Sequence, residues 1–359
     1  MLFSAYITHK DNFFYSKFVP NTLSPMIFSK HKLSIFLLLV STTIAAVSCN
    51  NTGNYRTIDG FTQGTTYHIV YSSEGDSLNS VVESILLMID NSLSVYNDSS
   101  LITAVNSNKE VYVDTLFENV FKKSVEIWRE SSGAFDISAA PLFEVWGFGK
   151  GGKKEVTPQM IDSIKAFVGM DKVTLKDGKV VKTDNRLSLN VNAIAQGYTA
   201  DVIAYEFDRR GVSNYLVEVG GEIFCKGVNP AGKKWSVGID RPEEGNMIQG
   251  AEIQTVILLS GRGLATSGNY RKFIEENGVK YSHTINPATG RPVKNNLLSA
   301  TVIAADAMTA DAYATWFMVV GLERAKEIIE SRDDIDALLI YDEDGEYRLY
   351  QSKGLEINK

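Results

Sequence analysis

The chain has 359 residues, of which 44% are hydrophobic and 22% are charged, proportions that are typical of a globular protein. Its formal net charge is −7 and its pI is about 5.3, so the composition gives no support for nucleic-acid binding, which would favour a basic face. The sequence shows no repeat at the spacing of a solenoid or a propeller.

Residues 1–48 have the features of a processing segment. Two lysines precede an apolar run that starts at Leu33 and passes through small residues to Cys49. This order of charge, apolar core and small residues is that of a secretory signal, and the cysteine makes it resemble a bacterial lipoprotein signal, in which Cys49 is lipidated and becomes the first mature residue. The alternative is a transmembrane anchor, but the apolar run is short for a span of about 20 residues. Met26 begins a clearer signal than the first methionine and is the expected start codon.

The mature chain is expected to begin with lipidated Cys49 and a polar tether over 49–55, followed by one large domain over 56–352. Alternation of Tyr67, Ile69 and Tyr71 predicts a strand over 65–71. Further strands are predicted at 173–175, 180–183, 187–191, 215–219, 222–226, 235–239, 254–259, 337–341 and 347–351. Helices are predicted at 77–92, 116–132, 157–168, 195–210, 309–320 and 323–331, with Thr157 as an N-cap and Pro158 at the first helical position.

The predicted helices and hairpin-like strands are mixed and do not follow the regular strand–helix–strand order of βαβ units. The predicted fold class is therefore α+β. Cys225 is the only cysteine besides Cys49, so no intrachain disulfide is expected once Cys49 is acylated. Cys225 itself is expected to be a small core residue of a strand.

Histidine is scarce, and this directs attention to one segment. Of the four histidines, two fall in the segment expected to be removed, which leaves His68 and His283. His283 lies between hydroxyl side chains, just ahead of a turn that contains Pro287 and Gly290. It is the leading candidate for acid–base chemistry near neutral pH. His68 is expected to be a solvated or hydrogen-bonded strand histidine.

A carboxylate and a hydroxyl are placed together near the start of a late helix. Asp311 and Thr315 are four residues apart, a spacing that puts both on one helix face. Two oxygen ligands, with other positions left to water and phosphate, are how proteins usually hold Mg²⁺. The spacing alone also permits a plainer interpretation, in which Asp311 interacts with the helix dipole and Thr315 bonds a backbone carbonyl.

Four other segments are weaker signals when each is taken alone. Glycine and aromatic residues in 132–136 and 146–149 could form a flat slot for a planar ring, or a helix C-cap at Gly133 with aromatics in the core. Residues 190–198 turn from a strand into a helix, where free backbone groups could face a ligand or an asparagine could cap the helix. The diglycine at 220–221 indicates a turn or bulge. The small residues at 265–270 could let a nucleotide approach the backbone closely, or could form a polar loop.

The order of these motifs is informative. Gly-Thr-x-Tyr, Gly-Ala-Phe-Asp with Trp-Gly-Phe-Gly, Asn-Ala-Ile-Ala-Gln-Gly-Tyr-x-x-Asp, Val-Gly-Gly-Glu, Thr-Ser-Gly-x-Tyr, Ser-His-x-Ile-x-Pro-x-Thr-Gly-x-Pro and Ala-Asp-Ala-x-x-Thr follow one another from about Arg56 to about Tyr350. This series resembles the ApbE family of flavin transferases. The resemblance implies an ApbE-type, T-fold-like architecture, a single large domain with two intertwined lobes.

The resemblance also implies an activity, Mg²⁺-dependent transfer of FMN from FAD to a threonine hydroxyl of an acceptor flavoprotein, with release of AMP. It implies that Asp311, Thr315 and the backbone carbonyl of Ala193 hold Mg²⁺, and that His283 is the base that helps the hydroxyl attack. It implies flavin or nucleotide contacts at Gln63, Tyr96, Ala134, Phe135, Asp136, Asn190, Gln196, Ser267 and Thr284.

The chain departs from the family pattern in one segment. Many members have Asp-x-Gly-Ala-x-Ala-Lys-Gly where this chain has Asn190 in place of the carboxylate, Asn192 in place of the glycine and Gln196 in place of the lysine. Glutamine can donate a hydrogen bond but brings no positive charge to a pyrophosphate. Two alternatives follow: FAD affinity or rate is lower than in those members, or the charge comes from Arg262, Arg271 or Arg291.

The expected location is the bacterial cell envelope, with the protein lipid-anchored through Cys49 and facing the periplasm. The expected acceptors are subunits of membrane redox complexes, an implication of the resemblance. Two alternatives stay open: an FAD pyrophosphatase that gives FMN and AMP, and a non-catalytic flavin-binding lipoprotein. His283, Asp311 and Thr315 together argue against the second alternative, because binding alone requires neither a base nor a metal site.

Overall fold

Alternating burial along one strand shows how the fold is built. Tyr67, Ile69 and Tyr71 point into a large apolar core, whereas Val70 points into a smaller one. Successive strand residues face opposite sides of a sheet, so a single sheet separates two apolar layers. The computed structural model describes residues 54–149, 155–243, 250–269, 273–276 and 279–358.

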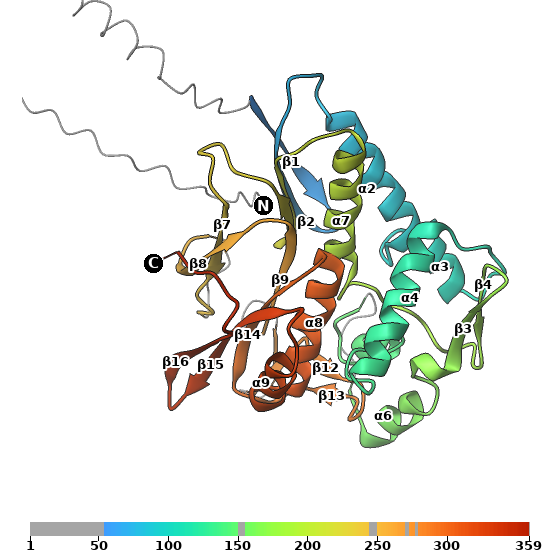
Figure 1. The fold of residues 1–359 in the computed structure, drawn as a ribbon. Coiled ribbons are helices and arrows are strands. Elements are labelled where there is room, and N and C mark those ends of the chain that lie inside the picture. Colours follow the sequence, from blue (N-terminus) through green and yellow to red (C-terminus); the bar gives the residue numbers. More distant parts are fainter. Residues whose placement is uncertain (1–53, 150–154, 244–249, 270–272, 277–278, 359) are drawn as a thin grey trace, which may run out of the picture. The chain divides into compact units, whose positions relative to one another are not determined.

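The sheet has eight strands, and each described neighbouring pair is antiparallel. Its strand order is β1 (Tyr55–Thr62), β2 (Thr65–Ser72), β5 (Tyr215–Val219), β6 (Glu222–Lys226), β9 (Arg262–Gly268), β14 (Leu297–Ala304), β15 (Asp336–Glu343) and β16 (Glu346–Gln351). Figure 1 shows helices on one side of this sheet and a separate two-stranded sheet on the other.

Helices cover the face of the sheet that carries the larger core. These are α2 (Asn79–Leu93), α7 (Ala195–Arg209), α8 (Ala307–Val320) and α9 (Leu322–Glu330). α7 packs on β5 and β6, and α8 packs on β9 and β14, so the two helices lie side by side. The other face carries the smaller core and is covered by β7 (Trp235–Asp240) and β8 (Ile253–Leu259).

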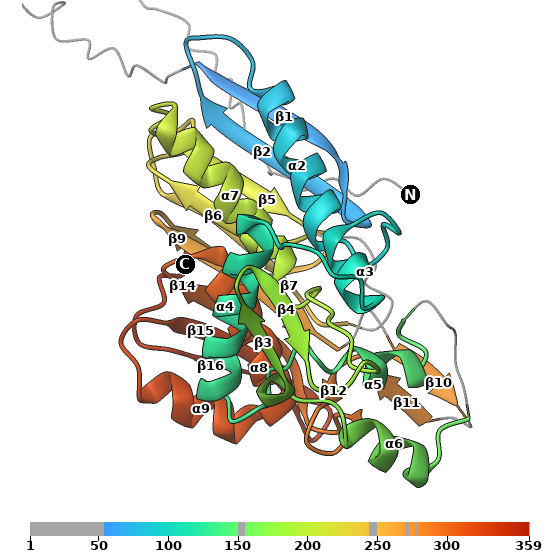
Figure 2. The same cartoon turned by 90° about the vertical axis from the view of Figure 1, so that its right-hand side faces the viewer.

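The chain between β2 and β5 forms further helices, which Figure 2 shows. Their buried side chains belong to the same large core. These helices are α3 (Leu101–Asn106), α4 (Thr115–Glu130), α5 (Ala140–Val145) and α6 (Pro158–Lys165). The same part of the chain also forms a 3₁₀ turn (Met170–Lys172) and a hairpin of β3 (Val173–Lys176) and β4 (Lys179–Lys182). Two short hairpins follow β9: β10 (Phe273–Glu276) with β11 (Val279–Ser282), and β12 (Ile285–Asn286) with β13 (Arg291–Pro292). None of the described helices is long and apolar enough to cross a bilayer.

The predicted α+β class and all six predicted helices are confirmed. Thr157 caps α6 by accepting a hydrogen bond from the amide of Met160, and Pro158 is its first residue. The prediction of a strand over 187–191 is wrong. The side chain of Asn106 bonds both the N–H and the C=O of Leu189, and Lys182 donates to the carbonyl of Leu187. Side chains therefore take the backbone hydrogen bonds that a neighbouring strand would make.

Three strands of the main sheet (β1, β9 and β14), the four short strands β10 to β13 and the two short helices α3 and α5 were not predicted. β9 is rich in small and polar residues, and 265–270 therefore looked like a loop. Gly263 is needed there because a Cβ atom would lie 2.2 Å from the backbone nitrogen of Ala307. β9 is thus a central strand on which α8 lies unusually close.

Candidate active site

The first feature of the site is a buried carboxylate between two helices. Asp311 in α8 is only 5% exposed, and its Oδ2 accepts a hydrogen bond of 3.2 Å from the amide of Gly197 in the first turn of α7. The N-cap of α7 is Ile194, which offers no side-chain cap. The expected asparagine cap is therefore wrong, because a carboxylate from another helix satisfies an amide at this positive helix end.

The surroundings of Asp311 favour a bound cation or a proton at its carboxylate. Burial raises the pKa of its carboxyl to about 7, with the bond from Gly197 opposing the shift. Among the described residues, no lysine or arginine is within ion-pair distance of Asp311. A buried charge without a partner is costly, so this position suits either a bound cation or a proton.

Thr315 lies one helical turn beyond Asp311, on the same face of α8. Its Oγ1 is 3.3 Å from the Oγ of Ser267 at the end of β9. Ala193 is half-buried and lies just before the start of α7, whose first turn contacts Asp311. Carboxylate, hydroxyl and carbonyl oxygens are ligands that suit Mg²⁺.

The described residues contain no cluster of three or more histidine, cysteine, aspartate or glutamate side chains that could hold a metal ion. A metal beside Asp311 would therefore depend on hydroxyl, carbonyl, water and phosphate oxygens. That donor set fits Mg²⁺, which usually keeps several waters and binds through one or two carboxylates and substrate phosphates.

Asp201 fixes the start of α8, a role that sequence reasoning missed. Its two carboxylate oxygens accept hydrogen bonds of 2.8 Å from the amides of Ala307 and Met308. Burial raises the pKa of Asp201 to about 7, against the effect of these bonds. The signal in the sequence was its place at the end of the Gln-Gly-Tyr-x-x-Asp motif, one turn after Gly197.

The side chains of Gln63 and Gln196 both lie beside the beginning of α7. Gln63 occupies the β1–β2 turn with a positive φ of 49°, and its Nε2 donates to the Oγ1 of Thr199 at 2.7 Å. The side-chain amide of Gln196 lies against Gly220: a Cβ added at Gly220 would be 2.5 Å from the Nε2 of Gln196. The diglycine is thus a tight turn, as expected, and it leaves room for the Gln196 amide.

Tyr96 and Asn190 lie along the segment that leads into α7. The ring of Tyr96 is 62% exposed, and its hydroxyl is 3.4 Å from the Nδ2 of Asn192. Asn190 accepts a hydrogen bond from the amide of Asn192, and its own amide donates to the carbonyl of Ile137 at 2.8 Å. This last bond joins the segment to the Ala134–Asp136 motif.

Residues 134–136 divide between core and site. Phe135 is 2% exposed in the large core, so any ligand contact at this residue would have to come from its backbone. Asp136 accepts hydrogen bonds from the amide and hydroxyl of Ser138, and burial still raises its pKa to about 6. Ala134 is only partly buried. The expected C-cap at Gly133 is wrong by two residues: Ser131 is the C-cap of α4, Ser132 adopts a φ of 52°, and Gly133, with a φ of 85°, donates to the carbonyl of Trp128.

His283 is half-buried and precedes the β12–β13 hairpin. Its ring meets the ring of Phe148 edge-on, with centroids 6.4 Å apart and an interplanar angle of 72°. The Nε1 of Trp146 donates to the carbonyl of Gly290 in the hairpin turn at 2.8 Å. The aromatics that could have formed a flat slot therefore contact the histidine hairpin.

The hairpin turn is closely specified by its residues. The carbonyl of Asn286 accepts from the amide of Gly290, and its side chain accepts from the amide of Ala288. Gly290 has a φ of 68°, and an added Cβ would lie 2.5 Å from Ile161. Thr284 is buried, and its carbonyl accepts a bond from the amide of Val293.

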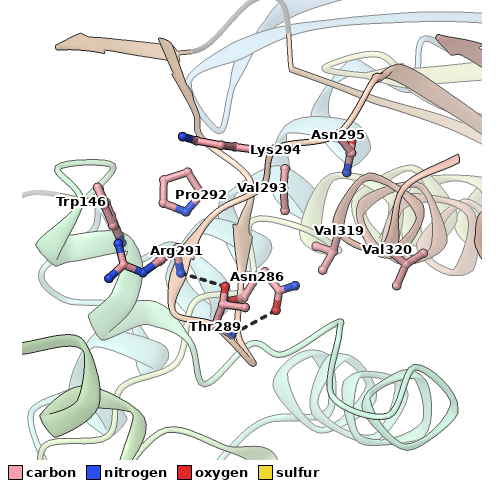
Figure 3. A pocket seen from close by; sticks show the side chains of 10 residues that line it. All are labelled: Trp146, Asn286, Thr289, Arg291, Pro292, Val293, Lys294, Asn295, Val319 and Val320. Atoms are coloured by element: carbon pink, nitrogen blue, oxygen red, sulfur yellow. Dashed lines mark hydrogen bonds between the residues drawn. The ribbon is translucent and has the colours of Figure 1, made fainter. Parts of the chain in front are cut away.

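A groove of about 510 Å³ lies beside this hairpin. Figure 3 shows hairpin residues on one side and the last turn of α8 on the other, with Trp146 at one end. The groove is lined by Trp146, Asn286, Thr289, Arg291, Pro292, Val293, Lys294, Asn295, Val319 and Val320.

Several other expected residues lie outside this site. His68 bonds Asp59 through Nδ1 at 2.5 Å, so the expectation of a hydrogen-bonded strand histidine is confirmed. Cys225 is a buried free thiol whose pKa is raised by burial. Arg262 binds Asp336 and nearby carbonyls at the end of β9 opposite Ser267, so it cannot supply charge to the site. The predicted signal, Cys49 and Arg271 lie outside the described residues.

The chain has an α+β fold in which the buried carboxylate of Asp311 and the hydroxyl of Thr315 lie on one face of α8, beside the first turn of α7. This arrangement suits a phosphoryl-transfer enzyme. The sequence profile of the ApbE family matches residues 63–339. The chain is 31% identical to the FAD:protein FMN transferase of Haemophilus influenzae over 330 residues, which cover 88% of this chain and 94% of the relative. It is 31% identical to that of Escherichia coli K12 over 308 residues, 82% of this chain and 86% of the relative.

Solved structures agree with the sequence comparisons. The flavin transferase ApbE from Vibrio cholerae matches with a TM-score of 0.75 and 32% identity, covering 84% of this chain and 97% of that one. The apo form of the Pseudomonas stutzeri flavinyl transferase ApbE matches with a TM-score of 0.75 and 29% identity, covering 84% of this chain and 95% of that one. The chain therefore belongs to the ApbE family.

Proposed function

We propose that this protein transfers FMN from FAD to a threonine hydroxyl of an acceptor flavoprotein. The observation that carries the proposal is the buried Asp311 carboxylate, which lacks a described cationic partner and lies on one helix face with Thr315. A new P–O bond forms between the hydroxyl oxygen and the FMN phosphorus. The pyrophosphate P–O bond breaks, and AMP leaves with the electron pair.

Three oxygen atoms would hold Mg²⁺: a carboxylate oxygen of Asp311, the hydroxyl of Thr315 and the carbonyl of Ala193. When bound, Mg²⁺ neutralises charge on the pyrophosphate. The fit rests on the burial of Asp311 and on the chemistry of these donors. The start of α7 adds the positive end of a helix dipole at the same place, which favours phosphate oxygens.

His283 is the proposed general base. An imidazole nitrogen accepts the proton of the threonine hydroxyl as its oxygen attacks phosphorus. The edge contact with Phe148 and the bond from Trp146 to the hairpin limit how far the ring can move. Limited movement matters because a base must be within hydrogen-bond reach of the hydroxyl.

Gln196 replaces a positive charge that many relatives carry. Its amide lies against Gly220 beside the start of α7, where it can donate a hydrogen bond to a phosphate or ribose oxygen. Arg262 is bound elsewhere in the fold, which leaves Arg271 and Arg291 as the named sources of a positive side chain. We propose that the helix dipole and Mg²⁺ neutralise most of the pyrophosphate charge. We therefore propose a strong dependence of FAD binding on Mg²⁺.

We further propose that the protein is a lipoprotein, anchored through Cys49 and facing the periplasm, and that its acceptors are subunits of membrane redox complexes. The order of charge, apolar run and cysteine in the first 49 residues supports the anchor. Intact mass and membrane fractionation of the wild type and Cys49→Ala test it. A Cys49→Ala protein that stays in the membrane fraction would contradict the anchor.

One assay separates transfer from its two alternatives. The mature protein is incubated with FAD, Mg²⁺ and an acceptor domain, and acceptor mass and AMP are measured. A mass gain of one FMN on the acceptor together with AMP supports the proposal. AMP with free FMN and no adduct identifies an FAD pyrophosphatase, and absence of AMP identifies a binding protein.

A further inference from the structure

The starts of α7 and α8 exchange carboxylates with each other. Asp311 of α8 accepts a hydrogen bond of 3.2 Å from the amide of Gly197 in α7. In return, Asp201 of α7 accepts bonds of 2.8 Å from the amides of Ala307 and Met308 at the start of α8. Asp201 follows Gly197 by four residues, as Asp311 follows Ala307. Each helix therefore donates from a backbone amide and accepts through a carboxylate one turn later.

The two helices also touch at the centre of this exchange. A Cβ added at Gly197 would lie 2.3 Å from the carbonyl oxygen of Ala307 and 2.9 Å from the Cβ of Asp311. Only glycine fits at such distances, so the backbones of α7 and α8 are in direct contact there. The exchanged bonds and this contact together fix the distance between the two helix starts.

This distance matters because the proposed Mg²⁺ ligands come from both helices. The carbonyl of Ala193 lies two residues before α7, whereas Asp311 and Thr315 belong to α8. A shift of α8 would therefore move two ligands relative to the third. Mg²⁺ requires nearly ideal octahedral geometry at about 2.0–2.1 Å, whereas Ca²⁺ accepts irregular geometry at about 2.3–2.6 Å. Displaced ligands thus lower the affinity for Mg²⁺ more than the affinity for Ca²⁺.

The bonds of Asp201 differ in kind from the other bonds at the start of α8. The side chain of Asp306 accepts from the amide of Thr309, and its carbonyl accepts from the amide of Ala310. Asp306 is the N-cap of α8, so these two bonds lie within the helix and its own cap. The bonds to Asp201 instead join α8 to α7.

We propose that Asp201 is a positioning residue that adapts the metal site to Mg²⁺. It acts through α8: by holding the start of this helix on α7, it sets the distance between the Asp311 carboxylate and the Ala193 carbonyl. This inference rests on the proposed function, because it requires these groups to bind the cation. Loss of a group that orients metal ligands typically lowers metal affinity about 10–100-fold.

The selectivity between two cations tests the proposal in Asp201→Asn. The asparagine oxygen can still accept from one amide of α8, but its NH₂ group is a donor and cannot accept from the other. Mg²⁺ or Ca²⁺ is titrated as the chloride into the mature protein with FAD, and the heat of binding gives each Kd. No acceptor protein is present, so the measurement reports binding and not transfer. Urea unfolding gives the stability of each variant.

Asp306→Ala is the matched control. It removes the same charge and one bond at the start of α8, that of the Thr309 amide, and should lower stability as the loss of an N-cap does. The lost bond lies within α8, so the distance between the helices is kept. A second variant, Asp201→Glu, keeps the charge and both acceptor oxygens but displaces them by one methylene, and it tests the distance even where Asp201→Asn does not fold.

We expect Asp201→Asn to raise the Kd for Mg²⁺ at least about tenfold and the Kd for Ca²⁺ less than about threefold. The two cations carry the same charge, so loss of the Asp201 charge alone weakens both equally and leaves the ratio of the two Kd values unchanged. Asp201→Glu should change this ratio in the same direction by a smaller factor. Asp306→Ala should keep the wild-type ratio.

Two results would overturn the proposal alone. One is a wild-type ratio in Asp201→Asn, or in Asp201→Glu where the asparagine variant does not fold. The other is an equal change of the ratio in Asp306→Ala, because the effect would then come from helix capping. Failure of the proposed function is distinguishable. A wild type that binds no Mg²⁺ overturns the metal site and this inference together, whereas the expected ratios without any FMN transfer support this inference and contradict the transfer.

Discussion

The indole nitrogen of Trp146 donates a 2.8 Å hydrogen bond to the carbonyl of Gly290, across 144 positions of sequence. This bond ties the C-cap residue of α5 to the turn of the hairpin that begins two residues after His283. Phe148, two residues later, meets the His283 ring edge-on. One short segment therefore contacts both the hairpin turn and the ring of His283, the proposed base.

Trp146→Phe is expected to weaken catalysis more than binding. The substitution leaves the Gly290 carbonyl without its buried donor, which costs about 1–3 kcal/mol. A looser hairpin places His283 less often within reach of the hydroxyl, so kcat for FMN transfer should fall about tenfold while the Kd for FAD stays the same.

Trp235→Phe is the matched control, since the indole nitrogen of Trp235 donates to the carbonyl of Lys226 at 2.9 Å on the other face of the sheet. It should lose similar stability and keep its transfer rate. Equal losses of kcat in both variants would show that Trp146 acts only through stability.

The sequence was most informative where one local rule decided the structure. Thr157 and Pro158 predicted the start of α6 because capping depends on neighbouring residues alone. The spacing of Asp311 and Thr315 likewise predicted a shared helix face. These relationships lie within one or two helical turns and need no knowledge of the remaining chain.

The sequence was least informative where two distant segments satisfy each other. The amide of Gly197 is capped by Asp311, and the amides of Ala307 and Met308 are capped by Asp201. No pattern within either helix shows this exchange. β9 was missed for a related reason, because its small residues reflect the close approach of α8 and not a loop.

His283→Ala is expected to separate binding from transfer. FAD contacts and the proposed Mg²⁺ ligands remain, so the Kd for FAD in Mg²⁺ should change less than about twofold. General-base catalysis typically contributes about 10²–10⁴-fold, and transfer should fall within that range. Stopped assays with mass detection of the acceptor give the rate, and an unchanged rate would remove the role of His283 as base.

Asp311→Asn is expected to abolish the dependence on Mg²⁺. Asparagine can still accept the bond from Gly197 but lacks the charge that would hold the cation. FAD titrations with and without Mg²⁺ should give the same, weaker Kd in the variant and different values in the wild type. A stimulation by Mg²⁺ that matches the wild type would refute the ligand assignment.

Gly197→Ala should destabilise the protein, although alanine usually favours a helix over glycine by about 1 kcal/mol. The added Cβ would lie 2.3 Å from the carbonyl oxygen of Ala307 and 2.9 Å from the Cβ of Asp311. Separating α7 from α8 should cost about 1–3 kcal/mol and reduce Mg²⁺ affinity. Gly75→Ala is the control, since its nearest neighbouring atom is 4.0 Å away; equal unfolding free energies for the two variants would contradict the close packing.

Asp136 should make stability depend on pH in the mildly acidic range. Burial raises the pKa of its carboxyl to about 6 in the folded protein, whereas the unfolded value is about 3.9. The folded state therefore binds a proton more tightly than the unfolded chain. The stabilisation that this tighter proton binding gives to the folded state is fully present below a pH of about 3.9. It is lost as the pH rises through about 6.

Asp136→Asn removes this titration while keeping an acceptor for the Ser138 amide. The free energy of unfolding of the variant relative to the wild type should therefore increase between pH 4 and pH 6.5, by roughly 3 kcal/mol at most. Urea unfolding at a series of pH values measures this difference, with Asp177→Asn, at an exposed position, as the matched control. A difference that is constant with pH would mean that Asp136 ionises as easily in the folded protein as in the unfolded chain, and that its bonds to Ser138 fully offset the cost of its burial.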